Sequence, residues 1–169
     1  ISVIIDTYNY GRFIEKAIDS VLNQTFPKSD FEIIVVDDGS TDGTPEIVKR
    51  YKDKLEYVYK ENGGQASAFN AGFENATGQI IVFLDADDYY HSNKLEVIAK
   101  KFQASESLDI AYHYLYIVDK TGRIIGEYPD HKISLEKHLL KSYLNADIPF
   151  IFPTHSICVR ASCLKKIMP

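Results

Sequence analysis

This sequence has little of the residue types and patterns that are typical of disulfide-rich, zinc-binding or membrane-spanning proteins. It has no tryptophan, one methionine and two cysteines, and Cys158 and Cys163 show neither a disulfide-framework nor a zinc-ligand spacing. We therefore expect two free thiols. No run approaches the roughly 18 apolar residues that span a bilayer, and no signal-peptide pattern opens the chain. A disulfide scaffold and a membrane-spanning segment are thus excluded for these 169 residues.

A strong charge of either sign is also missing. The net charge is -5, and the lysines and arginines are scattered instead of forming a basic stripe, which argues against a nucleic-acid partner. The 45% hydrophobic and 25% charged residues are typical of one globular domain, which we place at 1–169. The chain begins inside a strand-like run without an initiator methionine, so we expect a trimmed fragment of a cytoplasmic protein, with room for membrane segments or attachment to the inner membrane face outside it.

Apolar, β-branched runs alternate with stretches of helical periodicity, which predicts βαβ units around a mostly parallel sheet. The predicted strands are Ile1 to Ile5, Phe31 to Val36, Leu55 to Tyr59 and Gln79 to Leu84. The predicted helices are Phe13 to Leu22, a second capped by Thr44 and running to Tyr51, a third through Ala68 and Gly72 to Thr77-Gly78, and a fourth from Ser92 through Phe102.

The pattern changes after Asp109. Two apolar runs, Ile110 to Val118 and Arg123 to Tyr128, flank an Asp-Lys-Thr-Gly turn and predict a β-hairpin. A helix at Ser134 to Leu144 and a short strand at Ser156 to Val159 complete the prediction.

Acidic and small residues follow the predicted strands. Because ligands bind outside the carboxyl ends of strands in an open parallel sheet, these segments are the candidate site. Six aspartates occupy them, and such a cluster is repulsive unless a cation or hydrogen-bond donors offset it. The six are Asp6, Asp37, Asp38, Asp42, Asp85 and Asp87.

Four of these segments, in this order and spacing, resemble the family 2 glycosyltransferases of the GT-A fold. They are the opening strand with its Thr-Tyr-Asn turn, Ile1 to Asn9; the Val-Val-Asp-Asp-Gly-Ser-Thr-Asp motif, Ile33 to Thr44; the Asn-x-Gly to Asn-x-Gly segment, Asn62 to Gly72; and the Asp-x-Asp motif, Phe83 to Asp88. The resemblance covers the first hundred residues well and the remainder loosely. It implies an α/β/α sandwich of the Rossmann-like GT-A type.

The resemblance also implies the site. Asp38 is expected to accept a hydrogen bond from the base of a nucleoside diphosphate sugar, most simply a UDP-sugar, and Asp85 to meet the ribose. Asp87 is expected to coordinate Mn²⁺ or Mg²⁺ between the two phosphates, where a cation stabilises the charge of the leaving group. The expected nucleotide-binding residues are Asp6, Thr7, Tyr8, Asn9, Asp38, Gly64, Asp85 and Ala86.

Two positions depart from the family pattern. Asp6 stands where relatives usually carry proline, and we favour its interpretation as neutral variation over that of an added acceptor. Phe69 stands where relatives often carry arginine, which removes a phosphate partner.

The implied reaction is inverting transfer of the sugar to a hydroxyl of a carbohydrate, lipid-linked or protein acceptor. Its base is a carboxylate expected downstream of Pro169, which makes 1–169 a domain truncated on the acceptor side. His155 is a substitute candidate, although a structural or surface placement is favoured for a lone histidine. A nucleotide-sugar-binding module without turnover is the alternative function. A phosphoacceptor receiver is disfavoured, because the third strand ends in Glu61-Asn62 and not in a lone aspartate.

Overall fold

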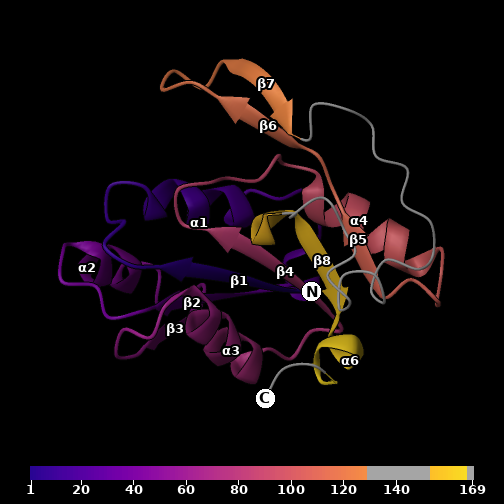
Figure 1. Cartoon of the computed structure of the whole chain (residues 1–169), viewed down its shortest axis with the longest axis horizontal. Coiled ribbons are helices and arrows are strands. Elements are labelled where there is room, and N and C mark those ends of the chain that lie inside the picture. Colours follow the sequence, from indigo (N-terminus) through magenta and orange to yellow (C-terminus); the bar gives the residue numbers. More distant parts are fainter. Residues whose placement is uncertain (129–152, 167–169) are drawn as a thin grey trace.

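The computed structural model describes residues 1–128 and 153–166. A six-stranded sheet at its centre has the order β3-β2-β1-β4-β8-β5 (Figure 1). The first four of these strands are parallel, and β8 runs antiparallel to both β4 and β5. The strands are β1 (Ser2–Thr7), β2 (Glu32–Asp37), β3 (Glu56–Tyr59), β4 (Ile80–Asp85), β5 (Ile110–Tyr112) and β8 (Ile157–Arg160).

Helices cover both faces of the sheet, and each face has its own apolar core. Along β1, Val3 and Ile5 point to one core and Ile4 to the other, so the strand is buried on both sides as expected of a central parallel strand. In Figure 1, α1 and α4 lie on one side of the sheet and α3 and α6 on the other. The helices are α1 (Ile14–Leu22), α2 (Thr44–Lys49), α3 (Gln65–Asn75), α4 (Lys94–Gln103) and α6 (Ala161–Leu164), with 3-10 turns at Lys28–Asp30 and Thr154–Ser156.

This architecture confirms the predicted α/β/α sandwich with a mostly parallel sheet. All four predicted strands and four predicted helices of the first hundred residues are present, and the predicted apolar face of α4 is buried as expected. One detail of α2 differs. Thr44 is its first helical residue and not its cap, and the Asp42 carboxylate accepts hydrogen bonds from both the Thr44 N–H and its hydroxyl.

The predicted hairpin was wrong in its first strand. Ile110 to Val118 is split into β5, which joins the main sheet, and β6 (Leu115–Val118), which pairs with β7 (Ile124–Tyr128) in a separate two-stranded sheet. The break falls at His113, whose N–H donates to the Ser156 carbonyl at the end of β5. The predicted helix at 134–144 lies outside the described residues.

No described helix is long and apolar enough to cross a membrane. Cys158 and Cys163 are free and buried, as expected from their spacing.

Helix α3 packs closely on the sheet through a glycine. A Cβ atom on Gly72 would lie 2.4 Å from Ile4 Cγ2, a distance that real Cβ contacts do not show, and 3.2 Å from Val36 Cγ2, which is a tight contact. The small residue therefore sets the distance between α3 and strands β1 and β2.

Replacing Gly72 by alanine is expected to lower the free energy of unfolding by about 1 to 3 kcal/mol, because overpacking outweighs the helix propensity that alanine gains. Urea denaturation followed by circular dichroism measures the change. Gly126→Ala is the control, since its Cβ would meet only Ile117 atoms at 3.6 Å or more. Equal stability of Gly72→Ala and the unmodified chain would contradict the close packing described here.

Candidate functional site

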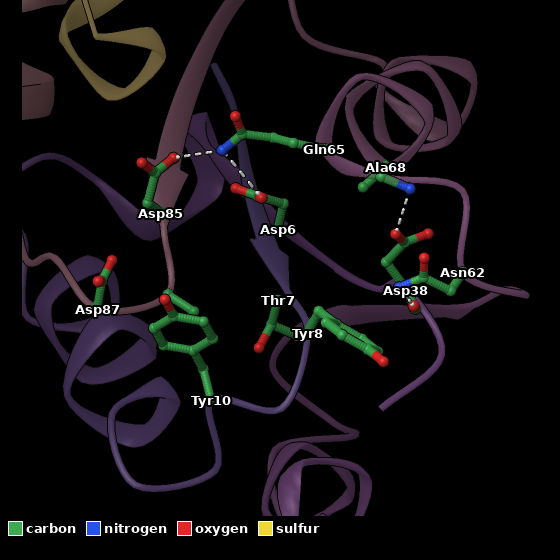
Figure 2. Close-up of a pocket in the computed structure, with 12 residues that line it drawn as sticks. Asp6, Thr7, Tyr8, Tyr10, Asp38, Asn62, Gln65, Ala68, Asp85 and Asp87 are labelled. Atoms are coloured by element: carbon green, nitrogen blue, oxygen red, sulfur yellow. Dashed lines mark hydrogen bonds between the residues drawn. The ribbon is translucent and has the colours of Figure 1, made fainter. Parts of the chain in front are cut away.

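A pocket of about 450 Å³ opens at the carboxyl ends of the central parallel strands (Figure 2). Asp38 and Asp87, which come from the ends of β2 and β4, line the same pocket, as the predicted site requires. The lining residues are Asp6, Thr7, Tyr8, Tyr10, Asp38, Asn62, Gly64, Gln65, Ala68, Asp85, Ala86 and Asp87.

Seven of the eight predicted nucleotide-binding residues line this pocket, and so does the predicted metal ligand Asp87. Asn9 is the exception. Its backbone has a positive φ of 58°, and its Oδ1 accepts hydrogen bonds from the backbone N–H groups of Thr41 and Asp42. Asn9 thus ties the loop after β1 to the loop after β2, and a direct contact with a nucleotide stays a prediction.

Two of the six clustered aspartates face away from the pocket. Asp37 is fully buried and accepts hydrogen bonds from the Ser40 N–H and the Tyr57 hydroxyl, each at 2.8 Å. The Asp42 carboxylate accepts from Thr44 and from the Gly11 N–H. Internal donors therefore account for these two carboxylates, and four aspartates are left at the pocket.

Asp38 is held by donors on three sides. Lys60 Nζ lies 2.6 Å from Oδ1, and the backbone N–H groups of Gly63 and Gly64 donate to the same carboxylate at 2.7 to 3.1 Å. Burial disfavours its charged form, but the hydrogen bonds from Lys60, Gly63 and Gly64 outweigh burial and lower the pKa of Asp38. The site therefore presents an ionised carboxylate to its ligand.

Asp6 and Asp85 are neighbours across the β1–β4 ladder. The side-chain amide of Gln65 donates to both carboxyl groups, to Asp6 Oδ2 and to Asp85 Oδ1, each at 3.2 Å (Figure 2). Burial, and next the charge of Asp85, raise the pKa of Asp6 to about 7. Asp6 is thus a polar member of the pocket wall, held against Asp85, although the sequence favoured neutral variation there.

A histidine contacts Asp85, one of the residues that line the pocket. His155 Nδ1 lies 2.9 Å from Asp85 Oδ2 and 3.3 Å from Asp88 Oδ2. Burial lowers the pKa of His155, but the hydrogen bond to Asp85 and the charge of Asp88 outweigh it, so the net pKa is raised. His155 thus contacts a residue of the pocket wall, and its role as a substitute base stays a prediction.

These three side chains have the composition and spacing of a cation site. One ligand atom from each of Asp85, Asp88 and His155 lies within 4.8 Å of the others. Carboxylate oxygens and an imidazole nitrogen suit Mn²⁺, and carboxylates suit Mg²⁺. A cation that replaced the proton on His155 Nδ1 would meet all three groups, so the residues fit the expected metal.

Lys94 lies behind this cluster. Its ammonium group is 3.5 Å from the centre of the Tyr90 ring and 3.4 Å from the His155 carbonyl oxygen. Burial lowers the pKa of Lys94 to about 8. No local pattern singled out Lys94, because in the sequence it reads only as a polar residue at the start of a helix.

Phe69 belongs to the core and not to the site. It is 7% exposed, and its ring centre lies 4.6 Å from that of Phe83. The position at which the family pattern led us to expect an arginine is therefore an apolar contact between α3 and β4.

Comparison with known proteins agrees with this geometry. The model of glycosyl transferase family 2 matches residues 2–165. An uncharacterized glycosyltransferase of Nostoc sp. is 39% identical over 174 residues, which cover 100% of this chain and 53% of that protein. The chain thus spans about half the length of this relative.

Solved structures of glycosyltransferases share the fold. The crystal structure of S. aureus TarS 1-349 is 32% identical, covers 98% of this chain and 48% of its own, and has a TM-score of 0.71. The same protein in complex with UDP-GlcNAc is 29% identical, with a TM-score of 0.68 and coverage of 98% and 46%.

Replacing Asp6 by asparagine is expected to stabilise the chain above pH 7. Because the folded-state pKa is raised from 3.8 to about 7, the folded chain binds more protons than the unfolded chain between these values, and stability falls as pH rises through that window. The asparagine side chain carries no such penalty, so the gain at pH 8 should be about 1 to 3 kcal/mol and should vanish below about pH 4. Urea titrations in EDTA at both pH values measure it, with the exposed Asp53→Asn as control. An equal gain at both pH values would contradict the assignment.

Proposed function

The chain belongs to glycosyl transferase family 2, and from this premise we propose that it binds a nucleoside diphosphate sugar and takes part in inverting transfer of the sugar to an acceptor hydroxyl. The observation that supports this most directly is the convergence of Asp38, Asp85 and Asp87 on one pocket. Charged donors and a cation are needed to bring a diphosphate to such a wall.

The nucleoside fits the half of the pocket formed by β1 and β2. An ionised Asp38 accepts an N–H from the base, and the ring of Tyr8, which is 46% exposed, offers a flat surface for stacking. The Thr7 hydroxyl is buried and has no hydrogen-bond partner within the described part of the chain, so a bound base could supply one. TarS, at 29% identity, binds UDP-GlcNAc, which supports a UDP-sugar as the donor.

The ribose and the diphosphate fit the half of the pocket formed by β4. Asp85 and Gln65, which are hydrogen-bonded to each other in the pocket wall, are our candidates for binding the ribose hydroxyls. A cation would be held at the end of β4 by the cluster of Asp85, Asp88 and His155. Asp87, which lines the pocket beside Asp85, is the further ligand that we propose. A bound Mn²⁺ or Mg²⁺ offsets the phosphate charge and stabilises the diphosphate as it leaves.

The transfer step itself is the attack of an acceptor oxygen on the anomeric carbon, opposite the departing diphosphate, with loss of the hydroxyl proton to a base. His155 Nδ1 is already occupied by Asp85 and Asp88, so this nitrogen does not serve as that base. We place the base in a carboxylate beyond Pro169, and the acceptor is a carbohydrate, lipid-linked or protein hydroxyl.

UDP is expected to bind in the presence of Mn²⁺ and to bind at least about tenfold more weakly in EDTA, because the acidic wall repels the free diphosphate. Asp87→Asn and His155→Gln should each weaken Mn²⁺-dependent binding by roughly 10- to 100-fold. Isothermal titration calorimetry measures both effects, and Asp53→Asn is the matched control. Absence of binding by UDP, GDP and dTDP to folded protein would remove the proposal.

A second measurement separates an enzyme from a binding module. A form of the protein extended beyond Pro169 is expected to release UDP from a UDP-sugar when an acceptor is supplied, because it gains the base. A coupled assay for UDP follows this release, with Asp87→Asn as the inactive control. An extended form that binds UDP with Mn²⁺ yet releases none with any acceptor in a panel would favour the binding module.

A further inference from the structure

An ion pair lies directly behind the base-binding half of the pocket. Asp38 is the first residue after β2 and Lys60 the first after β3, and the Lys60 N–H donates to the Asp37 carbonyl oxygen, continuing the β2–β3 ladder. The ladder thus places the two side chains together, with Lys60 Nζ 2.6 Å from Asp38 Oδ1. Their side chains are only 22% and 5% exposed, so water screens the pair weakly.

The donors around Asp38 leave its carboxylate one orientation. Lys60 and the Gly63 N–H occupy Oδ1, while the N–H groups of Gly63 and Gly64 occupy Oδ2. The backbone of Asp38 is held as well, since its N–H donates to the Thr7 carbonyl oxygen and its own carbonyl oxygen accepts from the Asn62 amide. Asp38 so held is one of the residues that line the pocket.

An ionised carboxylate can accept a hydrogen bond but cannot donate one. Uracil and thymine present an N3–H donor, and guanine presents an N1–H donor. Neutral cytosine and adenine present an acceptor nitrogen at the corresponding position. The charge state of Asp38 therefore decides which bases fit.

We propose that Lys60 is a positioning residue for base selection, which fixes the Asp38 carboxylate and supplies its counter-charge so that the pocket takes bases with a ring N–H donor and rejects cytosine. The proposal rests on the proposed binding of a nucleoside diphosphate sugar, and it adds a selectivity for the base of that ligand. Lys60 does not line the pocket, so it acts through Asp38 and not by direct contact with the base.

Because Lys60 is the counter-charge of Asp38, its role in base selection can be tested by measuring how that selectivity depends on pH. Lys60 is the charged side chain that faces the Asp38 carboxylate within the described residues, and the other groups on it are the neutral N–H donors of Gly63 and Gly64. The neighbouring Asp37 is turned toward Ser40 and Tyr57. Loss of Lys60 leaves burial only partly offset and raises the pKa of Asp38. A protonated Asp38 can donate to cytosine N3, so selectivity should then collapse at acid pH.

The experiment compares UDP and CDP by calorimetry with Mn²⁺ at about pH 8 and about pH 5.5, because the lower pH favours the protonated form of a carboxyl whose pKa is raised. The ratio of the two affinities is the readout, because effects of pH on the metal and phosphates are common to both ligands. The unmodified chain should prefer UDP by about tenfold or more at both pH values, the worth of one charge-assisted hydrogen bond. In Lys60→Met the ratio should fall roughly tenfold at the acid pH.

Lys60→Arg keeps the charge and should keep the ratio at both pH values. Lys101→Met removes an exposed lysine on α4 and should change nothing. If circular dichroism shows that Lys60→Met does not fold, the same affinity measurements on Lys60→Gln test whether Lys60 controls the ratio of UDP to CDP affinity. An unchanged ratio and pH profile in the uncharged variant would overturn the role of Lys60 while the function stands, whereas failure of the unmodified chain to bind UDP would overturn the function itself.

Discussion

Mutual repulsion among carboxylates at one edge of the sheet is the constraint on which the site depends. Parallel strands deliver their carboxyl ends to the same edge, and here β1, β2 and β4 each end at or beside an aspartate. Gathering these charges costs free energy unless each is offset. Each such carboxylate for which the structure gives contacts is offset by neighbouring groups. Lys60 and backbone N–H groups donate to Asp38. Gln65 donates to Asp6 and Asp85, and His155 contacts Asp85 and Asp88.

These contacts differ between the two halves of the pocket. Around Asp38 the offsetting groups are internal and permanent, which leaves a fixed acceptor suited to an N–H donor. At the end of β4 one group is shared, since His155 Nδ1 lies 2.9 Å from Asp85 Oδ2 and 3.3 Å from Asp88 Oδ2. Asp85, Asp88 and His155 would together hold a divalent cation, and a cation there, beside the Asp38 acceptor, is what the proposed binding of a nucleoside diphosphate requires.

The two departures from the family pattern follow from the same packing. Phe69 fills the contact between α3 and β4, so that position serves the core. Asp6 and Gln65 form a hydrogen-bonded group with Asp85, which a proline at position 6 could not make. The wall of this pocket is therefore more polar beside Asp85 than the family pattern implies.

The sequence by itself determined the order of strands and helices in the first hundred residues, because hydrophobic periodicity and turn residues are local signals. It also placed Asp38, Asp85 and Asp87 at one edge, since parallel strands must end together. Only the tertiary structure decided which aspartates face the pocket, and it split the predicted hairpin at His113 to supply β5 to the main sheet. It alone brought Lys60 to Asp38 and His155 to Asp85, because these pairs are 22 and 70 residues apart and depend on strand pairing that no local pattern records.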